Sequence, residues 1–136
     1  CGCVQKGGTA PIEDVIGYGE EVKAKGLTLL YGPGNDLVSG TALTAAGAGL
    51  ILFTTGRGTP FGAPVPTVKI ATNSSIARKK KNWMDFNAGT IAEGESLDAV
   101  GERLLSYVLS VASGQKTKNE ENGFRQISIF KDGVVL

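Results

Sequence analysis

The sequence predicts an α/β fold, a mostly parallel sheet of four to five strands with helices packed on it. Short apolar runs typical of strands alternate along the chain with segments whose apolar residues recur at helical spacing. Hydrophobic residues make up 41% of the 136 residues and charged residues 20%, which excludes a disordered chain and allows a core. We therefore expect one α/β domain over residues 1–136.

The composition excludes several kinds of catalytic and metal site. The chain has no histidine, so it cannot itself supply a histidine metal ligand or a Ser–His–Asp triad. Any general base must be Lys, Asp, Glu, Tyr or Cys. A net charge of +1 gives no field that attracts nucleic acid, and no apolar run approaches transmembrane length. We expect neither nucleic acid nor a membrane as a partner.

The two cysteines, Cys1 and Cys3, are too few and too close together for a disulfide framework. Reduced thiols and a cytoplasmic location are therefore expected. The chain does not begin with methionine, and we interpret it as an excised piece of a longer protein.

The chain begins with a predicted loop over 1–8 and a short helix over 9–18. The helix is expected because apolar residues recur at helical spacing after a proline in the first turn, namely Ile12, Val15 and Ile16. A strand is predicted over 26–31, ended by a glycine–proline–glycine turn.

A second helix is predicted from Asn35 or Asp36 to Ala46, built mostly of small residues. Two interpretations of its start remain open. The free amides of the first turn can bind an anion, or the turn can simply be a capped connection between strand and helix.

The central feature of the chain is an apolar strand over 50–53 that runs into a loop rich in glycine, with Arg57 within it. Four large apolar residues in a row predict a strand buried on both faces. In open α/β sheets, ligands bind beyond the carboxyl ends of the strands, so this loop is a candidate binding loop. The alternative is an ordinary turn with an exposed arginine.

Lys69 interrupts the apolar run of the next predicted strand, 65–71. Its side chain either faces solvent at a sheet edge or points into a site. A helix capped within 72–75 follows, and it ends in the basic run 78–81. We interpret this run as a solvated helix end, placed favourably for the helix dipole.

Asp85 and Asn87 lie two residues apart in the segment 83–89, which is expected to be a short strand or extended loop. They indicate either a polar site or a pair of local turns. The strongest helix runs from Ser96 to Gly114, with one apolar face formed by Leu97, Val100, Leu104, Val108 and Val111.

The last elements are a surface connection over 115–123, a strand over 126–130 and a turn at Asp132-Gly133. The alternation of strands and helices completes a Rossmann-like three-layer architecture.

Several blocks together resemble the carboxy-terminal region of the altronate/galactarate dehydratase family, closer to the altronate branch. They are 2–8 (GCVQKGG), 33–36 (PGND), 52–62 (LFTTGRGTPFG), 69–73 (KIATN), 85–89 (DFNAG) and 111–117 (VASGQKT). The resemblance implies a lyase that removes water from a sugar acid with a divalent metal, usually iron(II). It also implies that an amino-terminal part of the same protein is a partner. The fragment alone is expected to be inactive, with metal ligands partly outside it.

The chemistry that the resemblance implies is matched to residues as a hypothesis. Arg57 is expected to bind the substrate carboxylate and Lys69 or Lys6 to act as base. Cys3 is a metal ligand only if donors from outside the fragment join it. The predicted substrate-binding residues are Asn35, Asp36, Thr55, Gly56, Gly58, Asn73, Asp85 and Asn87. The alternatives are a non-catalytic anion-binding or oligomerisation module, with a possible homo-oligomer, and a fragment of a sulfolactate sulfo-lyase subunit.

Overall fold

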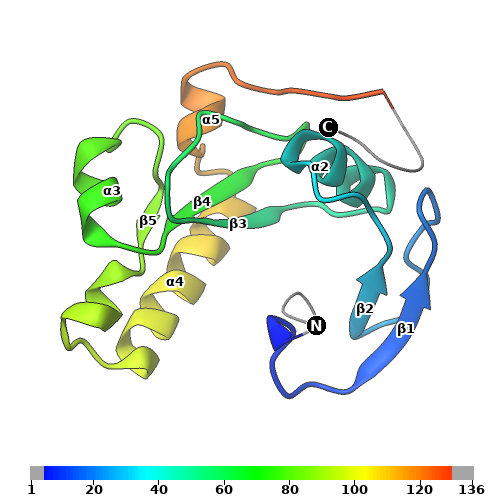
Figure 1. Ribbon diagram of the computed structural model, residues 1–136, viewed down its shortest axis with the longest axis horizontal. Coiled ribbons are helices and arrows are strands. Elements are labelled where there is room, and N and C mark those ends of the chain that lie inside the picture. Colours follow the sequence, from blue (N-terminus) through cyan, green and yellow to red (C-terminus); the bar gives the residue numbers. More distant parts are fainter. Residues whose placement is uncertain (1–4, 130–136) are drawn as a thin grey trace. The chain divides into compact units, whose positions relative to one another are not determined.

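The computed structural model describes residues 5–129 and divides the chain into two compact units. Within the described residues the first unit comprises 5–48 with 128–129, and the second comprises 49–127. Each unit contains a parallel sheet (Figure 1). The α/β class with parallel strands and packed helices is therefore confirmed. The strands form two separate sheets of two and three strands, however, because β1 and β2 pair only with each other.

The first unit contains β1 (Ile12–Ile16), β2 (Leu27–Leu30) and α2 (Asp36–Ala45). The predicted strand and the second predicted helix are confirmed. The predicted helix over 9–18 is wrong, because β1 occupies this segment and pairs in parallel with β2. Its apolar residues are β-branched, and pairing along the backbone outweighs a stripe of three residues.

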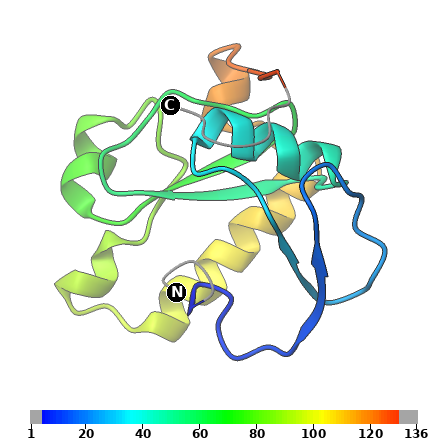
Figure 2. The ribbon, with the colours of Figure 1, turned by 45° about the vertical axis from the view of Figure 1, so that its right-hand side comes forward.

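The second unit contains the strands β3 (Ile51–Thr55), β4 (Thr67–Ala71) and β5 (Phe86–Asn87), paired in parallel in the order β3-β4-β5. Its helices are α3 (Ser74–Lys79), the 3₁₀ helix η1 (Gly89–Glu93), α4 (Leu97–Ala112) and α5 (Lys118–Glu121). In Figures 1 and 2, α4 runs across one face of this sheet. The core forms between them from Val68, Ile70 and Val111, with Leu104 and Tyr107 packed against it.

Two further sequence predictions, one about burial and one about a strand, are corrected. β3 is not buried on both faces, since Leu52 is 50% exposed on an edge strand with only β4 beside it. No strand forms over 126–129, the described part of the predicted last strand. Ile127 and Ile129 are 74% and 85% exposed, so the apolar face of the segment is uncovered. The predicted turn at 132–133 lies outside the described residues.

The helices of the second unit follow their sequence signals. Ser96 caps α4 by accepting a hydrogen bond from Ala99 N at 3.2 Å, and Val100 and Val111 are buried as predicted. Leu97, at the first position of the predicted face, is 69% exposed. Within residues 5–129, no helix is long and apolar enough to cross a membrane.

Candidate functional site

The three parallel strands of the second unit end together at one edge of the sheet. The register pairs Thr55 with Ala71 and Ala71 with Asn87, so the segments that follow β3, β4 and β5 leave from the same edge. This is the edge at which ligands bind in open α/β sheets. The structure thereby brings together five residues predicted from the sequence: Thr55, Gly56, Gly58, Asn73 and Asn87.

The loop after β3 is tied to the segment after β4. Thr55 O accepts hydrogen bonds from Thr72 N at 3.0 Å and from Thr72 Oγ1 at 3.3 Å. Gly56 O accepts one from Asn73 Nδ2 at 3.0 Å. The other end of the same amide, Asn73 Oδ1, accepts from Ile76 N at 2.9 Å and caps α3. Asn73 therefore fixes both the backbone of the loop after β3 and the start of α3.

Two lysines hold the next three carbonyl groups of the loop. Lys80 Nζ donates to Arg57 O at 2.8 Å and to Gly58 O at 3.1 Å. Lys69 Nζ donates to Thr59 O at 3.2 Å from beneath the loop. Five successive carbonyl oxygens, from Thr55 to Thr59, thus face hydrogen-bond donors of the second unit. These hydrogen bonds restrain the backbone of the loop at each peptide from 55 to 59.

The side chain of Arg57 is exposed on this restrained loop. Its guanidinium makes no hydrogen bond or ion pair with another residue of 5–129. Arg57 N and Gly58 N instead donate to Thr55 Oγ1, at 3.4 and 3.0 Å. The backbone at Arg57 is therefore tied to its surroundings, while the guanidinium of Arg57 keeps its donors unpaired within 5–129.

Lys69 does not face solvent, because its side chain is fully buried in the middle of β4. That excludes the solvent-facing alternative. Burial lowers the pKa of the Lys69 amine, and the nearby Asp85 carboxylate partly offsets the shift. Lys69 is held through its backbone too, since Lys69 N donates to Asp85 Oδ2 at 2.8 Å and Asp85 N donates to Lys69 O at 2.9 Å.

Asp85 joins β4, α4 and α5. Besides the bond from β4, Asp85 Oδ1 accepts from Lys118 N at 2.7 Å and from Tyr107 OH at 3.4 Å. Burial raises the pKa of Asp85, although the backbone donors of Lys69 and Lys118 act in the opposite direction. Burial, followed by the charge of Asp85, raises the pKa of Tyr107 to about 12. Both carboxylate oxygens are thus used within the chain.

Asn87 links β5 to the start of α3. Asn87 Nδ2 donates to Ser74 Oγ at 3.0 Å, and Asn87 Oδ1 accepts from Gly89 N at 2.9 Å. The backbones approach so closely here that a Cβ on Gly89 would lie 2.3 Å from Ser74 N and 2.4 Å from Asn73 Cα. Only glycine fits at that position.

The remaining predicted residues belong to the first unit. Asn35 Oδ1 accepts hydrogen bonds from Leu37 N at 3.1 Å and Val38 N at 3.3 Å, which is the geometry of a helix cap. Asp36 and Lys6 are exposed. Cys3 lies outside the described residues.

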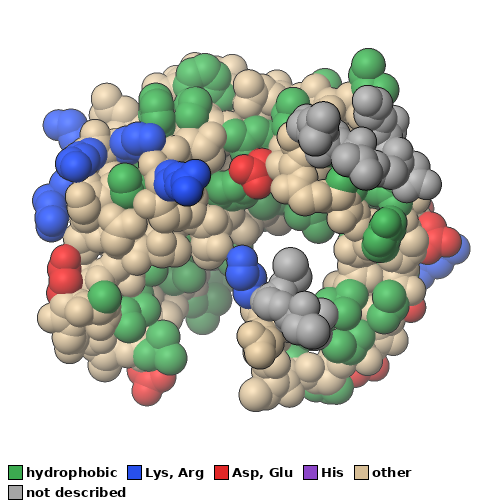
Figure 3. Space-filling model, in the orientation of Figure 1, with side chains coloured by type: hydrophobic (Ala, Val, Ile, Leu, Met, Phe, Trp, Pro, Cys, Tyr) green, Lys and Arg blue, Asp and Glu red, His purple; other side chains and the backbone are tan. Residues whose placement is uncertain are grey.

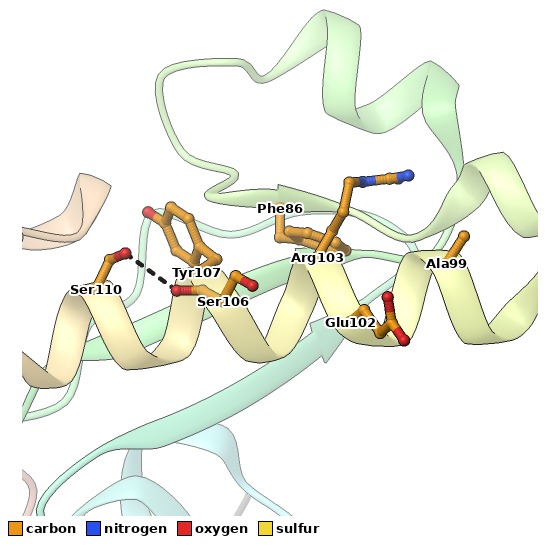
Figure 4. Close-up of a pocket in the computed structure, with 7 residues that line it drawn as sticks. All are labelled: Phe86, Ala99, Glu102, Arg103, Ser106, Tyr107 and Ser110. Carbon is orange, nitrogen blue, oxygen red and sulfur yellow. Dashed lines mark hydrogen bonds between the residues drawn. The ribbon is translucent and has the colours of Figure 1, made fainter.

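A separate groove is lined by residues other than the predicted site residues. It is a groove of about 690 Å³ beside α4 (Figure 4). The rings of Phe86 and Tyr107, with centroids 6.4 Å apart, contribute its apolar surface. Arg103, on its rim, pairs with Glu95. No predicted site residue lines this groove.

A divalent metal was expected with ligands partly outside this fragment, so the described residues show only which donors this part of the chain offers. Across 5–129, no group of three or more His, Cys, Asp or Glu side chains is placed to hold a metal ion. These residues therefore do not form a metal site by themselves.

Lys80 is the residue of this region that sequence reasoning missed. Its membership of a basic run at a helix end indicated a solvated side chain, yet Lys80 is half-buried and bonded to the loop. Its partners lie 22 and 23 residues away, and no local pattern marks a contact of that range.

Comparison with known proteins shows the family to which the chain belongs. A family model described as "D-galactarate/Altronate dehydratase, C-terminal" matches residues 1–135. The chain is 53% identical over 136 residues to altronate dehydratase of Bacillus subtilis (strain 168). The aligned region covers 99% of this chain and 27% of that protein. It is 50% identical over 135 residues to altronate dehydratase of Escherichia coli (strain K12), with 99% and 27% covered. To galactarate dehydratase (L-threo-forming) of Escherichia coli it is 39% identical over 138 residues, with 98% and 26% covered. The chain thus spans about a quarter of the length of these relatives.

Proposed function

Because the chain belongs to the family of D-galactarate/altronate dehydratase C-terminal domains, we propose that it is the C-terminal domain of a hydro-lyase that removes water from a sugar acid. The proposed substrate is an aldonate of the altronate type, and the product is a 2-keto-3-deoxy acid. Identities of 53% and 50% to two altronate dehydratases, against 39% to a galactarate dehydratase, favour this substrate class.

The proposed reaction defines what the site must supply. A base removes the proton from the carbon beside the carboxylate, and the hydroxyl group on the next carbon leaves as water after protonation. The carbon–carbon double bond so formed is an enol, which becomes the keto acid by proton transfer. Negative charge builds up on the carboxylate side during proton removal, so fixed cations and donors there lower the barrier.

Arg57 is proposed to bind the substrate carboxylate. The observation that carries this role is an exposed guanidinium without an acidic partner in 5–129, on a loop whose carbonyl oxygens are turned to other donors. A guanidinium binds a carboxylate through two parallel hydrogen bonds and so fixes its orientation as well as its charge.

Each of the other predicted residues keeps its own proposed role. Lys69 is proposed as the base, supported by a pKa that burial lowers towards a neutral amine. Lys6 is the second candidate. Substrate hydroxyl groups are proposed to bind Asn35, Asp36, Thr55, Gly56, Gly58, Asn73, Asp85 and Asn87.

We further propose that iron(II) or another divalent metal takes part with ligands outside residues 5–129, Cys3 among them. The amino-terminal part of the longer protein is the proposed source of the remaining ligands. When bound, such an ion would stabilise negative charge on the substrate. The cytoplasm is the proposed location.

The test is an assay of the full-length protein on altronate, galactarate and sulfolactate, with and without ferrous iron. Formation of a 2-keto-3-deoxy acid from altronate, at a higher kcat/KM than from galactarate, is expected. If only sulfolactate were turned over, the protein would be a sulfo-lyase and the proposed dehydratase activity would be wrong. Binding of sugar acids without turnover of any of the three would leave an anion-binding module instead.

A further inference from the structure

Lys80 reaches from the end of α3 to the loop that carries Arg57. Its Nζ lies 2.8 Å from Arg57 O and 3.1 Å from Gly58 O. The aliphatic part of Lys80 packs on the loop as well, because a Cβ on Gly58 would lie 2.8 Å from Lys80 Cδ. The ammonium group also sits 4.9 Å from the ring centroid of Trp83, within the range of a cation–π contact.

The neighbours of Lys80 behave differently. Figure 3 shows Lys and Arg side chains gathered over α3, at the left of the view. Arg78, Lys79 and Lys81 are exposed, whereas Lys80 is half-buried. Among the described residues, none of the three neighbours has a side chain hydrogen-bonded to the loop after β3. One member of a basic run is therefore fixed, and the others are solvated.

The geometry points to Lys80 as a positioning residue that holds the Arg57 loop for anion binding. Its ammonium group draws two successive carbonyl oxygens towards α3. Carbonyl oxygens that faced the bound anion would repel it, so turning them away leaves the positive groups of the loop to face it. The charge of Lys80 stays beside the loop and adds to the attraction. This inference rests on the proposed role of Arg57 in binding the substrate carboxylate.

The kinetic test compares Lys80→Met with Lys79→Met in the full-length enzyme. Lys80→Met keeps the packing on Gly58 and removes only the charge and the donors. We expect KM for altronate to rise about tenfold, the ratio that corresponds to about 1.4 kcal/mol. We expect kcat to change less than about threefold, because a ground-state binding contact is lost. Lys80→Arg, which can donate to both carbonyl oxygens, should restore most of the affinity.

Lys79→Met makes the same change of charge one residue away, without a contact to the loop. It should leave KM within about twofold of the wild type, since exposed charges are screened by salt. Equal rises in KM for Lys79→Met and Lys80→Met would overturn the inference, because net charge would then explain the effect. A loss of kcat alone in Lys80→Met would overturn it as well.

A second readout does not depend on activity. Amide hydrogen exchange over 56–59 in the full-length protein should become faster in Lys80→Met and stay unchanged in Lys79→Met. Unchanged exchange in both variants would refute the positioning role even in an active enzyme. If exchange became faster in Lys80→Met but the protein turned over none of the sugar acids, the proposed function would be refuted. The role of Lys80 in holding the loop would then still stand.

Discussion

The side-chain nitrogen of Lys69 lies 3.2 Å from the carbonyl oxygen of Thr59, and the lysine that makes this contact is fully buried in β4. A buried ammonium group loses its hydration, and one backbone carbonyl replaces only part of it. Asp85 is the acidic group whose charge acts on it. The loop after β3 is therefore held at Thr59 by a lysine whose charged form is disfavoured by burial.

Replacing Lys69 by Met should change how stability depends on pH. Burial lowers the pKa of Lys69, so between its folded-state pKa and the ordinary value of 10.5 the unfolded chain binds more protons. The free energy of unfolding of the wild type should therefore rise relative to Lys69→Met as pH increases towards 10.5. The relative slope reaches at most about 1.4 kcal/mol per pH unit.

Denaturant unfolding of both proteins at a series of pH values from neutral to 10.5 measures this difference. Taking the difference removes the contribution of the tyrosines, which both proteins share. Parallel curves would show that the folded protein keeps Lys69 charged at no cost.

The contacts of Lys69 and Lys80 show what sequence patterns could and could not predict. β2, β3, β4, α2 and α4 followed from apolar runs and helix caps, because these signals lie within the element itself. Thr55, Asn73 and Asn87 were grouped in one candidate site through the resemblance, and the parallel register brings the ends of their strands to the same edge. Which strand pairs with which was not predictable from signals within each strand. The split into two sheets depends on contacts between distant segments.

β1 and Lys80 show the same limit at the level of single residues. Three β-branched residues at helical spacing indicated a helix, and only pairing with β2 made the segment a strand. The sequence showed Lys80 as one of four similar basic residues. Lys80 is bonded to the loop after β3 and Lys79 is not, because the fold places that loop beside the end of α3.

Gly89→Ala should destabilise the protein, and Gly101→Ala should stabilise it. A Cβ on Gly89 would lie 2.3 Å from a backbone nitrogen, which cannot move without shifting the start of α3. A loss above about 2 kcal/mol is expected, as for overpacked sites. A Cβ on Gly101 in α4 would meet nothing within 4 Å, and alanine favours a helix by about 0.8–1 kcal/mol over glycine. Equilibrium denaturation of both variants checks the opposite signs; a tolerated Gly89→Ala would contradict the tight approach.

Arg57→Ala should lower kcat/KM of the full-length enzyme about 100-fold, the scale for losing one group that stabilises developing charge. Stability should stay within about 0.5 kcal/mol, because the Arg57 side chain is exposed and makes no bond within 5–129. Arg57→Lys keeps the charge but loses the two-pronged geometry, so an intermediate rate is expected. Steady-state kinetics and thermal unfolding of the three proteins test this. Full activity of Arg57→Ala would remove Arg57 from the mechanism.

Asn73 caps α3 and also binds the loop after β3, and one pair of variants separates these two roles. Asn73→Asp keeps the acceptor for Ile76 N and so keeps the cap of α3, but it loses the amide donor to Gly56 O. Asn73→Ala loses both. Stability should fall by about 1 kcal/mol in the alanine variant and less in the aspartate variant, because a carboxylate is also a good cap.

Activity should behave in the opposite way to stability. The carboxylate of Asn73→Asp would face the carbonyl oxygen of Gly56 and repel both it and an anionic substrate near Arg57. The aspartate variant should therefore have the higher KM of the two while remaining the more stable protein. Unfolding midpoints and KM values measured on the same preparations decide the matter. If KM simply followed stability across the pair, Asn73 would act only as a helix cap, and its bond to the Arg57 loop would have no part in substrate binding.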